Sequence, residues 1–223
     1  MPRPEPIKID LRWTDTYSVS SRAYDCLDDS ERAVAERLPQ SARASYIAAH
    51  SLLRIMLSEW DARPPRSWRF ATSEYGKPYL RDSQLRFNIS HSANHAVVVV
   101  SDGAEMGVDV EDIAPHHVDA EIARRMFSDL EYQQWMQADN QVATFFQLWT
   151  LKEAYMKAIG LGVNLPLQDF SVILSPPQLI HRKLPASGWH LSSQLIETKA
   201  VLGLVAKPDH GRDVEMVLQR ITL

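Results

Sequence analysis

The chain has 223 residues, of which 45% are hydrophobic and 23% are charged. This balance is typical of a folded globular protein and excludes a disordered chain. The formal net charge of −4 does not favour a nucleic-acid partner, and no apolar run is long enough to cross a bilayer, so we also expect no membrane partner. The single cysteine, Cys26, cannot form an intrachain disulfide, which fits a cytoplasmic protein.

The first part of the chain predicts a strand, then a long helix, then short strands. Residues 7–13 alternate apolar and polar side chains, as in a half-buried strand. Between Ser41 and Trp60, apolar side chains recur every three or four residues, which predicts an amphipathic helix. Short strands are expected at residues 68–73, 85–90, 96–101 and 106–112. The Asp102-Gly103 step favours a hairpin between the last two.

The second part of the chain repeats this order of elements. Ser128 and Glu131 fit a capping box at the start of a helix. A longer helix is predicted from Asn140 to Ile159, ended by Gly160. Strands are expected at residues 169–174, 188–196, 200–206 and 214–221. The sequence therefore predicts two similar halves, residues 1–104 and 105–223, which pack as one compact body because no linker-like stretch separates them.

The first candidate site is the acidic pair of GVDVED, Asp109 and Glu111. On a strand, residues two apart point to the same face, so both carboxylates could reach one ion. Oxygen ligands of this kind suit Mg²⁺. The alternative is an ordinary strand with a solvated acidic face, and this short motif alone does not decide between the two.

The second candidate site lies in WTLKEAYMKAIG, where Trp149, Glu153 and Lys157 follow one another at four-residue steps. Such residues share one face of a helix. The spacing is also that of an ordinary surface pair between a glutamate and a lysine, with Trp149 in the core. Taken alone, the pattern favours the surface pair over a reaction centre.

The third candidate site is the run NISHS, in which Ser90 and His91 offer donors that can hold phosphate oxygens. Lys77 lies in a turn shortly before it. In the alternative interpretation, His91 pairs with a backbone carbonyl and Lys77 is a solvated turn residue. The chain has neither a GxxxxGK[ST] loop nor a GxGxxG fingerprint, so phosphate binding would depend on a metal and on separate cations.

Four motifs, taken together and in order, resemble the surfactin-type 4′-phosphopantetheinyl transferases: YGKP at 75–78, FNISHS at 87–92, GVDVE at 107–111 and WTLKEAYMKAIG at 149–160. The stretch AAHSLLR at 48–54 is also similar. The resemblance implies an α+β fold of two pseudo-twofold-related halves, each a small, mostly antiparallel sheet packed with helices, with the active site in the cleft between them. It also implies transfer of the phosphopantetheine arm of coenzyme A to a serine of an apo acyl or peptidyl carrier protein. Adenosine 3′,5′-bisphosphate would be released.

The resemblance assigns roles to the acidic residues. It implies that Asp109, Glu111 and Glu153 hold Mg²⁺ or Mn²⁺. Glu153 would also be the base for the carrier serine, and Lys157 would contact the phosphate and stabilise the leaving group. These roles are chemically consistent, because attack on a diphosphate needs its charge neutralised and a proton removed from the nucleophile.

The resemblance also implies coenzyme A contacts at Lys77, Ser90, His91 and Lys157. One departure concerns the 3′-phosphate of coenzyme A, because many members of the family have an arginine where this chain has Ser45. Arg43 and Arg32 are the candidate replacements, with Arg37 as a further one.

Two alternatives of other classes remain open, and so does the partner surface. A degenerate relative could bind coenzyme A or a carrier without transfer, and the three acids could instead form an Mg²⁺-dependent phosphodiesterase. For a transferase, residues 114–127 are a candidate docking surface, since charged side chains there are mixed with Met126 and Phe127. We expect a monomer, because both halves of the cleft lie in one chain.

Overall fold

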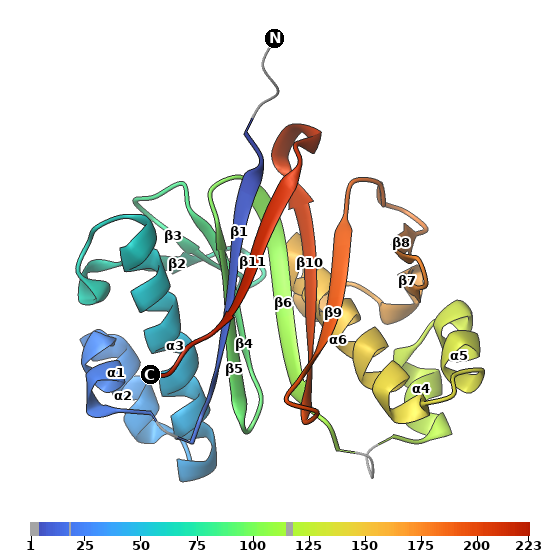
Figure 1. The fold of residues 1–223 in the computed structure, drawn as a ribbon, viewed down its shortest axis with the longest axis horizontal. Coiled ribbons are helices and arrows are strands. Elements are labelled where there is room, and N and C mark those ends of the chain that lie inside the picture. Colours follow the sequence, from blue (N-terminus) through green and yellow to red (C-terminus); the bar gives the residue numbers. More distant parts are fainter. Residues whose placement is uncertain (1–4, 18, 115–117) are drawn as a thin grey trace.

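The structure is a computed structural model that describes residues 5–17, 19–114 and 118–223 (Figure 1). The first part contains β1 (Ile7–Asp15), α1 (Ser21–Cys26), α2 (Asp29–Arg37), α3 (Gln40–Trp60), β2 (Phe70–Thr72), β3 (Pro78–Leu80), β4 (Arg86–His91) and β5 (His95–Ser101). The second part contains β6 (Ala104–Asp112), α4 (Ala120–Met126), α5 (Asp129–Met136), α6 (Gln141–Ile159), β7 (Phe170–Leu174), β8 (Pro177–His181), β9 (His190–Ile196) and β10 (Ala200–Pro208). The last strand is β11 (Val214–Arg220). In the described ranges, the order of one strand, three α-helices and four strands therefore occurs twice.

The strand pairing repeats in the same way as the element order. The first sheet has the order β11-β1-β5-β4, and the second has the order β6-β10-β9. β1 pairs with β5 as β6 pairs with β10, in both cases antiparallel. The hairpins β2-β3 and β7-β8 also correspond. The fold is therefore α+β with two topologically equivalent units, as expected, and the extra strand β11 returns to pair in parallel with β1 of the first unit.

The predicted hairpin at Asp102-Gly103 is wrong. β5 pairs with β1 and β4, whereas β6 pairs with β10, so the two strands belong to different sheets. The short connection instead passes from one sheet to the other. The division at residues 104 and 105 remains a prediction, and this connection is the place where the chain changes sheets.

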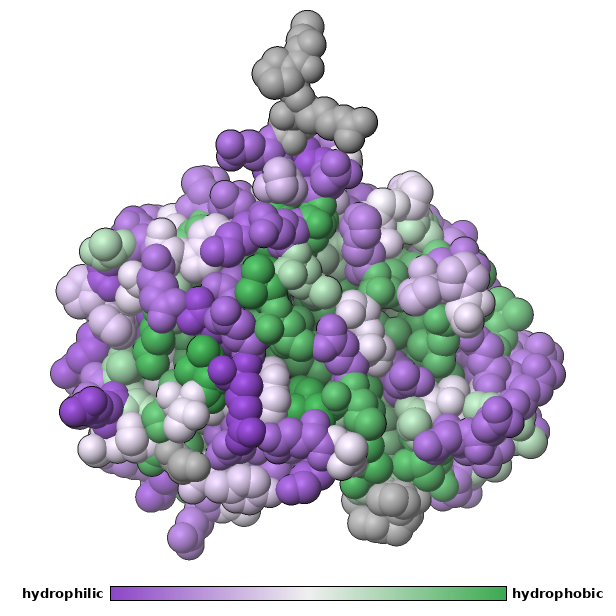
Figure 2. All heavy atoms as spheres, viewed as in Figure 1, coloured by the Kyte–Doolittle hydropathy of each residue, from purple (hydrophilic) through white to green (hydrophobic). Residues whose placement is uncertain are grey.

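The core lies in layers between the sheets and under the helices. Side chains alternate along β5, so Val97 and Val99 pack with Val108 of β6 between the two sheets. Val98 and Val100 face the other way and pack with the apolar face of α3. Figure 1 shows α1–α3 and α4–α6 on opposite flanks of the strands. Figure 2, drawn from the same side, shows hydrophobic residues gathered over the strands at the middle of this face.

Two glycines allow α6 to lie very close to the second sheet. A Cβ atom added to Gly107 of β6 would lie 1.9 Å from the carbonyl oxygen of Ala154. A Cβ added to Gly203 of β10 would lie 2.7 Å from the carbonyl carbon of Thr150. Since any other residue at these positions would push the helix away, the glycines fix the position of α6 relative to β6.

Each unit contains a buried ion pair between two of its helices, which the sequence analysis did not predict. In the first, Arg54 of α3 donates from Nε to Glu31 of α2 at 2.6 Å. In the second, Lys152 of α6 donates to Glu131 of α5 at 2.7 Å. Each glutamate is the third residue of its helix and closes a capping box. In each unit this ion pair therefore joins the second helix to the third and longest one. The cation is an arginine in the first unit and a lysine in the second.

Most of the predicted elements are present with bounds that differ by a few residues. The helix predicted over 140–159 is α6, and Gly160 ends it in the left-handed conformation with φ of 72°. The capping box of Ser128 is also confirmed. The short strands β3 and β8 were not predicted. No helix in the described ranges is long and apolar enough to span a membrane.

Candidate active site

Asp109 lies where the two units meet. Its side chain is buried on β6, and its Oδ1 accepts hydrogen bonds from Ser90 Oγ of β4 at 2.8 Å and from Lys157 Nζ of α6 at 2.7 Å. Its Oδ2 is buried and has no hydrogen-bond partner among the described residues. The side-chain oxygen of Asn88 accepts from the backbone N–H of Val108 at 2.9 Å, which holds β4 against β6. Two strands from different sheets and one helix therefore position this carboxylate.

Glu111 lies two residues further along β6, as the alternation of the strand requires. Its Oε1 accepts a hydrogen bond from Trp149 Nε1 of α6 at 3.4 Å. Burial and the nearby negative charge of Asp109 raise the pKa of Glu111 to about 7. Trp149 thus contacts an acid of the site, in addition to packing against the core.

Glu153 and Lys157 lie on the face of α6 that is turned toward β6. The pKa of the Glu153 carboxyl is raised, mainly by burial and then by the charge of Asp109, while Lys157 partly offsets these effects. The ion pair of Lys157 is with Asp109 and joins α6 to β6. The ordinary surface pair between Glu153 and Lys157 is therefore not what the structure shows.

The NISHS run forms the end of β4, beside Asp109. Ser90 is buried and donates to Asp109, while its oxygen accepts from Lys157 Nζ at 2.8 Å. His91 is the next residue, at the exposed end of the strand; partial burial and then the nearby His50 and Lys157 lower the pKa of its imidazole, and Asp109 partly offsets this. The structure thus brings together the predicted residues Ser90, His91, Asp109, Glu111, Glu153 and Lys157.

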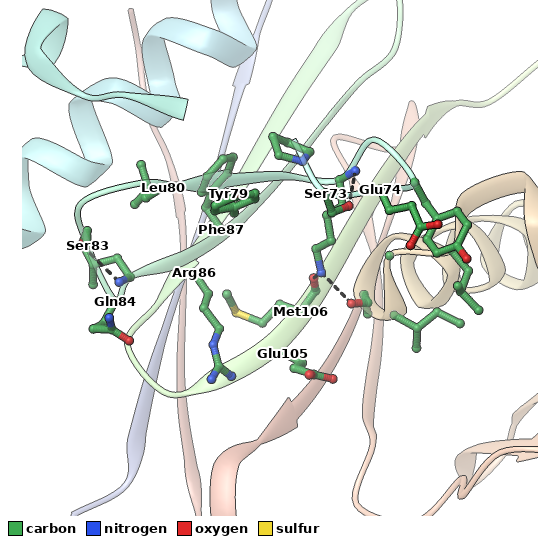
Figure 3. A pocket seen from close by; sticks show the side chains of 18 residues that line it. Ser73, Glu74, Tyr79, Leu80, Ser83, Gln84, Arg86, Phe87, Glu105 and Met106 are labelled. Atoms are coloured by element: carbon green, nitrogen blue, oxygen red, sulfur yellow. Dashed lines mark hydrogen bonds between the residues drawn. The ribbon is translucent and has the colours of Figure 1, made fainter. Parts of the chain in front are cut away.

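Lys77 lies in the turn of the β2–β3 hairpin and contacts the C-terminal end of α6. Its Nζ donates to the carbonyl oxygens of Ala158 at 2.6 Å and Met106 at 3.3 Å. Burial lowers the pKa of Lys77 to about 8. It also lines a cavity of about 670 Å³, in which Figure 3 shows the side chain of Met106 pointing toward Arg86. None of the carboxylates of the candidate site lines this cavity.

The two arginines expected at the 3′-phosphate are engaged elsewhere. The guanidinium of Arg43 donates to three backbone carbonyls near the end of α2, at distances from 2.9 to 3.4 Å. Arg32 pairs with Asp25 at 3.2 Å and stacks on Tyr24. The hydroxyl of Ser45 is turned to a carbonyl within its own helix. The structure does not bring these side chains to the carboxylate group, and their role in coenzyme A binding stays a prediction.

Sequence reasoning missed a second group of polar side chains, in the first unit. His50, Arg69 and Arg81 line a cavity of about 640 Å³ between α2, α3 and the β2–β3 hairpin. They are far apart in sequence, and of the three only His50 lies in a quoted motif, AAHSLLR, so no spacing signal joins them. The fold alone brings them together.

The residues of the site fit a divalent cation. The Oδ2 of Asp109 has no hydrogen-bond partner among the described residues, and burial and the charge of Asp109 raise the pKa of Glu111, so a cation would stabilise both carboxylates. No three His, Cys, Asp or Glu side chains in the described part of the chain are already arranged as a metal site. The ammonium of Lys157 lies on the oxygen of Asp109 instead. Carboxylate oxygens, completed by waters, are nevertheless the donor set that Mg²⁺ prefers.

The predicted docking surface at residues 114–127 is wrong at Phe127. Phe127 is 2% exposed and packs in the core with Phe145, so it is not available to a partner. Arg124 stacks on Tyr132. Residues 115–117 of that segment lie outside the described residues.

Comparison with known proteins agrees with the resemblance seen in the sequence. Residues 105–205 match the model of the 4′-phosphopantetheinyl transferase superfamily. The chain is 34% identical over 172 residues to 4′-phosphopantetheinyl transferase Sfp of Bacillus subtilis (strain 168), covering 74% of this chain and 75% of that protein. It is 38% identical over 160 residues to 4′-phosphopantetheinyl transferase psf-1 of Bacillus pumilus, covering 70% and 67%.

Among solved structures, Thermotoga maritima holo-[acyl-carrier-protein] synthase matches with a TM-score of 0.40 at 21% identity, over 48% of this chain and 64% of that one. The relationship to the transferases rests on the sequence identity with Sfp and psf-1, which extends over both units. The chain belongs to the 4′-phosphopantetheinyl transferase superfamily.

Proposed function

We propose that the protein transfers the 4′-phosphopantetheine arm of coenzyme A to a serine of an apo acyl or peptidyl carrier protein. Adenosine 3′,5′-bisphosphate would be the second product. The observation that carries the proposal is the contact of Lys157 and Ser90 with Asp109, beside the partly buried Glu111 and Glu153. An anionic diphosphate needs cations, and the serine needs a base. This group of side chains offers both.

Asp109, Glu111 and Glu153 would hold Mg²⁺ or Mn²⁺. When bound, the ion supplies charge neutralisation on the diphosphate. The unpaired Oδ2 of Asp109 is the oxygen best prepared for it, since it is already desolvated. Trp149 keeps Glu111 turned toward α6 through its indole N–H.

Glu153 would take the proton of the carrier serine. Burial raises the pKa of Glu153 in the protein without metal, whereas a bound cation would lower it, so Glu153 would be ionised and available as a base. As the proton leaves, a bond forms between the serine oxygen and the β-phosphorus of coenzyme A. The bond from this phosphorus to the bridging oxygen breaks, and adenosine 3′,5′-bisphosphate leaves with that electron pair.

Lys157 would contact the diphosphate and stabilise the leaving group. Its ammonium is already positioned by Asp109, Ser90 and the carbonyl of Val108. A pre-positioned cation costs little reorganisation when negative charge develops on the bridging oxygen. Ser90 and His91 would bind further diphosphate oxygens, and Lys77 would lie on the adenosine side, at the hairpin turn.

Transfer is tested by mass spectrometry of an apo carrier protein incubated with the enzyme, coenzyme A and Mg²⁺. The carrier should gain the mass of one phosphopantetheinyl group, and chelation of the metal by EDTA should abolish the gain. A protein that binds coenzyme A but modifies none of a panel of acyl and peptidyl carriers would be a binding module. Cleavage of coenzyme A without a carrier would indicate a phosphodiesterase.

The metal assignment can be tested without turnover. Mn²⁺ titrated into the protein should give a bound spectrum by electron paramagnetic resonance, and Asp109→Asn should weaken this binding strongly. Asp102→Asn is the matched control, because Asp102 is exposed in the connection between β5 and β6. Equal Mn²⁺ affinity for both variants would contradict the assignment.

A further inference from the structure

Two arginines lie side by side at the open end of the β2–β3 hairpin. Arg81 donates its backbone N–H to the carbonyl of Arg69 at 3.1 Å, one residue beyond the pairing of Phe70 with Leu80. Both side chains are exposed, and neither has an ion-pair partner among the described residues. Like charges directly opposite each other on a hairpin are destabilising. An anion between the two guanidinium groups would relieve this repulsion.

Both arginines line the cavity of about 640 Å³ in the first unit. Its apolar walls include Phe70, Phe87 and Ile89. This volume lies within the range of small-molecule sites, which combine apolar walls with a few polar groups. The cavity can therefore hold a flat ring with an anionic substituent at the arginine end.

Two of the acids that line this cavity are held by the same buried arginine. Asp28 and Glu31 each accept from the fully buried guanidinium of Arg54 at 2.6 Å. Glu31 also pairs with Nδ1 of His50 at 3.1 Å. Asp82, next to Arg81, is the lining acid that has no cation partner among the described residues. Arg54 balances only one of these two negative charges, but it holds both carboxylates, so Arg69 and Arg81 are the lining arginines left without an ion pair among the described residues.

The cavity connects to the candidate active site. A smaller cavity of about 240 Å³ is lined by Lys77 and Lys157, and it shares Ile89 and Pro78 with the larger one. A strand rises about 3.3 Å per residue, so Phe87 in the larger cavity lies about 10 Å along β4 from Ser90. One nucleotide can bridge such a span. A ligand whose diphosphate contacts Lys157 can thus place its nucleoside end beside the hairpin.

We propose that Arg69 and Arg81 bind the 3′-phosphate of coenzyme A. This assignment rests on the proposed function. It accounts for the absence of an arginine at Ser45 and for the engagement of Arg43 with the carbonyls of α2. Guanidinium groups suit the task because their planar N–H donors bind phosphate oxygens in pairs. The phosphate would also remove the unfavourable pairing of two cations on the hairpin.

The test compares coenzyme A with dephospho-coenzyme A, which lacks the 3′-phosphate, by isothermal titration. Arg81→Ala and Arg69→Ala should each weaken coenzyme A binding roughly tenfold or more and leave dephospho-coenzyme A binding nearly unchanged, because only the first ligand loses a charge-assisted contact. Arg182→Ala is the matched control, since Arg182 is exposed and lies outside this cavity. Asp82→Asn should act in the opposite sense and tighten coenzyme A selectively.

The outcomes separate this assignment from the proposed function. If the unsubstituted protein modifies a carrier but the arginine variants lose both ligands equally or neither, Arg69 and Arg81 do not bind the 3′-phosphate, while the transferase function stands. If the unsubstituted protein binds no coenzyme A, both proposals fail. Thermal melting of each variant, with both ligands absent, shows whether a lost affinity reflects lost folding.

Discussion

The ammonium of Lys157 lies 2.7 Å from the carboxylate of Asp109, a residue of a different element and 48 positions earlier in the chain. The ion pair of Lys157 is thus not with Glu153, which lies four residues before it on α6. The pKa of the Glu153 carboxyl is raised. The helix therefore carries a positioned cation and a basic carboxylate on one face. This division of roles is what a phosphoryl transfer with a hydroxyl nucleophile requires.

Glu153→Gln should abolish transfer while keeping coenzyme A binding. The substitution preserves shape but removes a general base, whose contribution is typically about 10²–10⁴-fold in rate. Transfer to a carrier is measured by mass spectrometry and coenzyme A affinity by calorimetry. Gln147→Glu, which exchanges the same two residue types elsewhere on α6, serves as the control for a change of one charge unit on this helix. An affinity loss as large as the rate loss would show that Glu153 acts in binding rather than in catalysis.

Sequence periodicity predicted the two long helices because each buries one continuous face. It gave α3 and α6 with bounds close to those observed. The end of α6 at Gly160 and the capping box of Ser128 were also predictable, because both depend on residues within one turn. The strands β3 and β8 are too short, and too dependent on their distant partners, to give such a pattern.

The candidate site was predictable in composition but not in its contacts. The motifs named Asp109, Glu153 and Lys157, whereas the spacing favoured a pair between the last two. The actual partner of Lys157 is set by the close approach of α6 to β6, which depends on a glycine in another element. The contacts of Arg43 could not be predicted either, because the sequence around Arg43 does not show that the carbonyls at the end of α2 lie within reach of its side chain.

Lys152→Met should destabilise the protein strongly, because it leaves the buried carboxylate of Glu131 without its cation. Removing one partner of a buried ion pair costs about 3–5 kcal/mol of unfolding free energy. Urea unfolding measures this loss. Lys183→Met removes an exposed pair with Asp169 and should change the free energy of unfolding little. Adding Glu131→Gln to Lys152→Met should recover part of the loss; a fully additive double variant would show that the two residues do not interact.

The buried amine of Lys77 should make stability depend on pH. Its pKa is about 8 in the folded protein, against 10.5 for an ordinary lysine. Below pH 8 both states carry the proton, and burial of the charge lowers stability. Between about pH 8 and 10.5 the folded chain loses the proton first, so the free energy of unfolding should rise with pH. Urea unfolding at pH 7 and pH 9.5 should show this rise in the unsubstituted protein but not in Lys77→Met; parallel curves would refute it.

Gly107→Ala should displace α6 from the second sheet and thereby impair both stability and transfer. The added methyl group would meet the carbonyl of Ala154 at 1.9 Å, and a backbone carbonyl cannot move unless the helix moves. Overpacking of this kind costs about 1–3 kcal/mol, and a shift of about 1 Å at the reacting groups can lower the rate about 100-fold.

Gly103→Ala is the matched control for Gly107→Ala. At Gly103 a new Cβ would meet only side-chain atoms of Arg212 and Ile7, at 2.8 and 3.1 Å, and the long side chain of Arg212 can turn away. Urea unfolding and carrier modification are measured on both variants. Equal losses in the two would mean that the contact between β6 and α6 is not what holds Glu153 and Lys157 beside Asp109. A loss confined to Gly107→Ala supports the view that one glycine sets the geometry of the site.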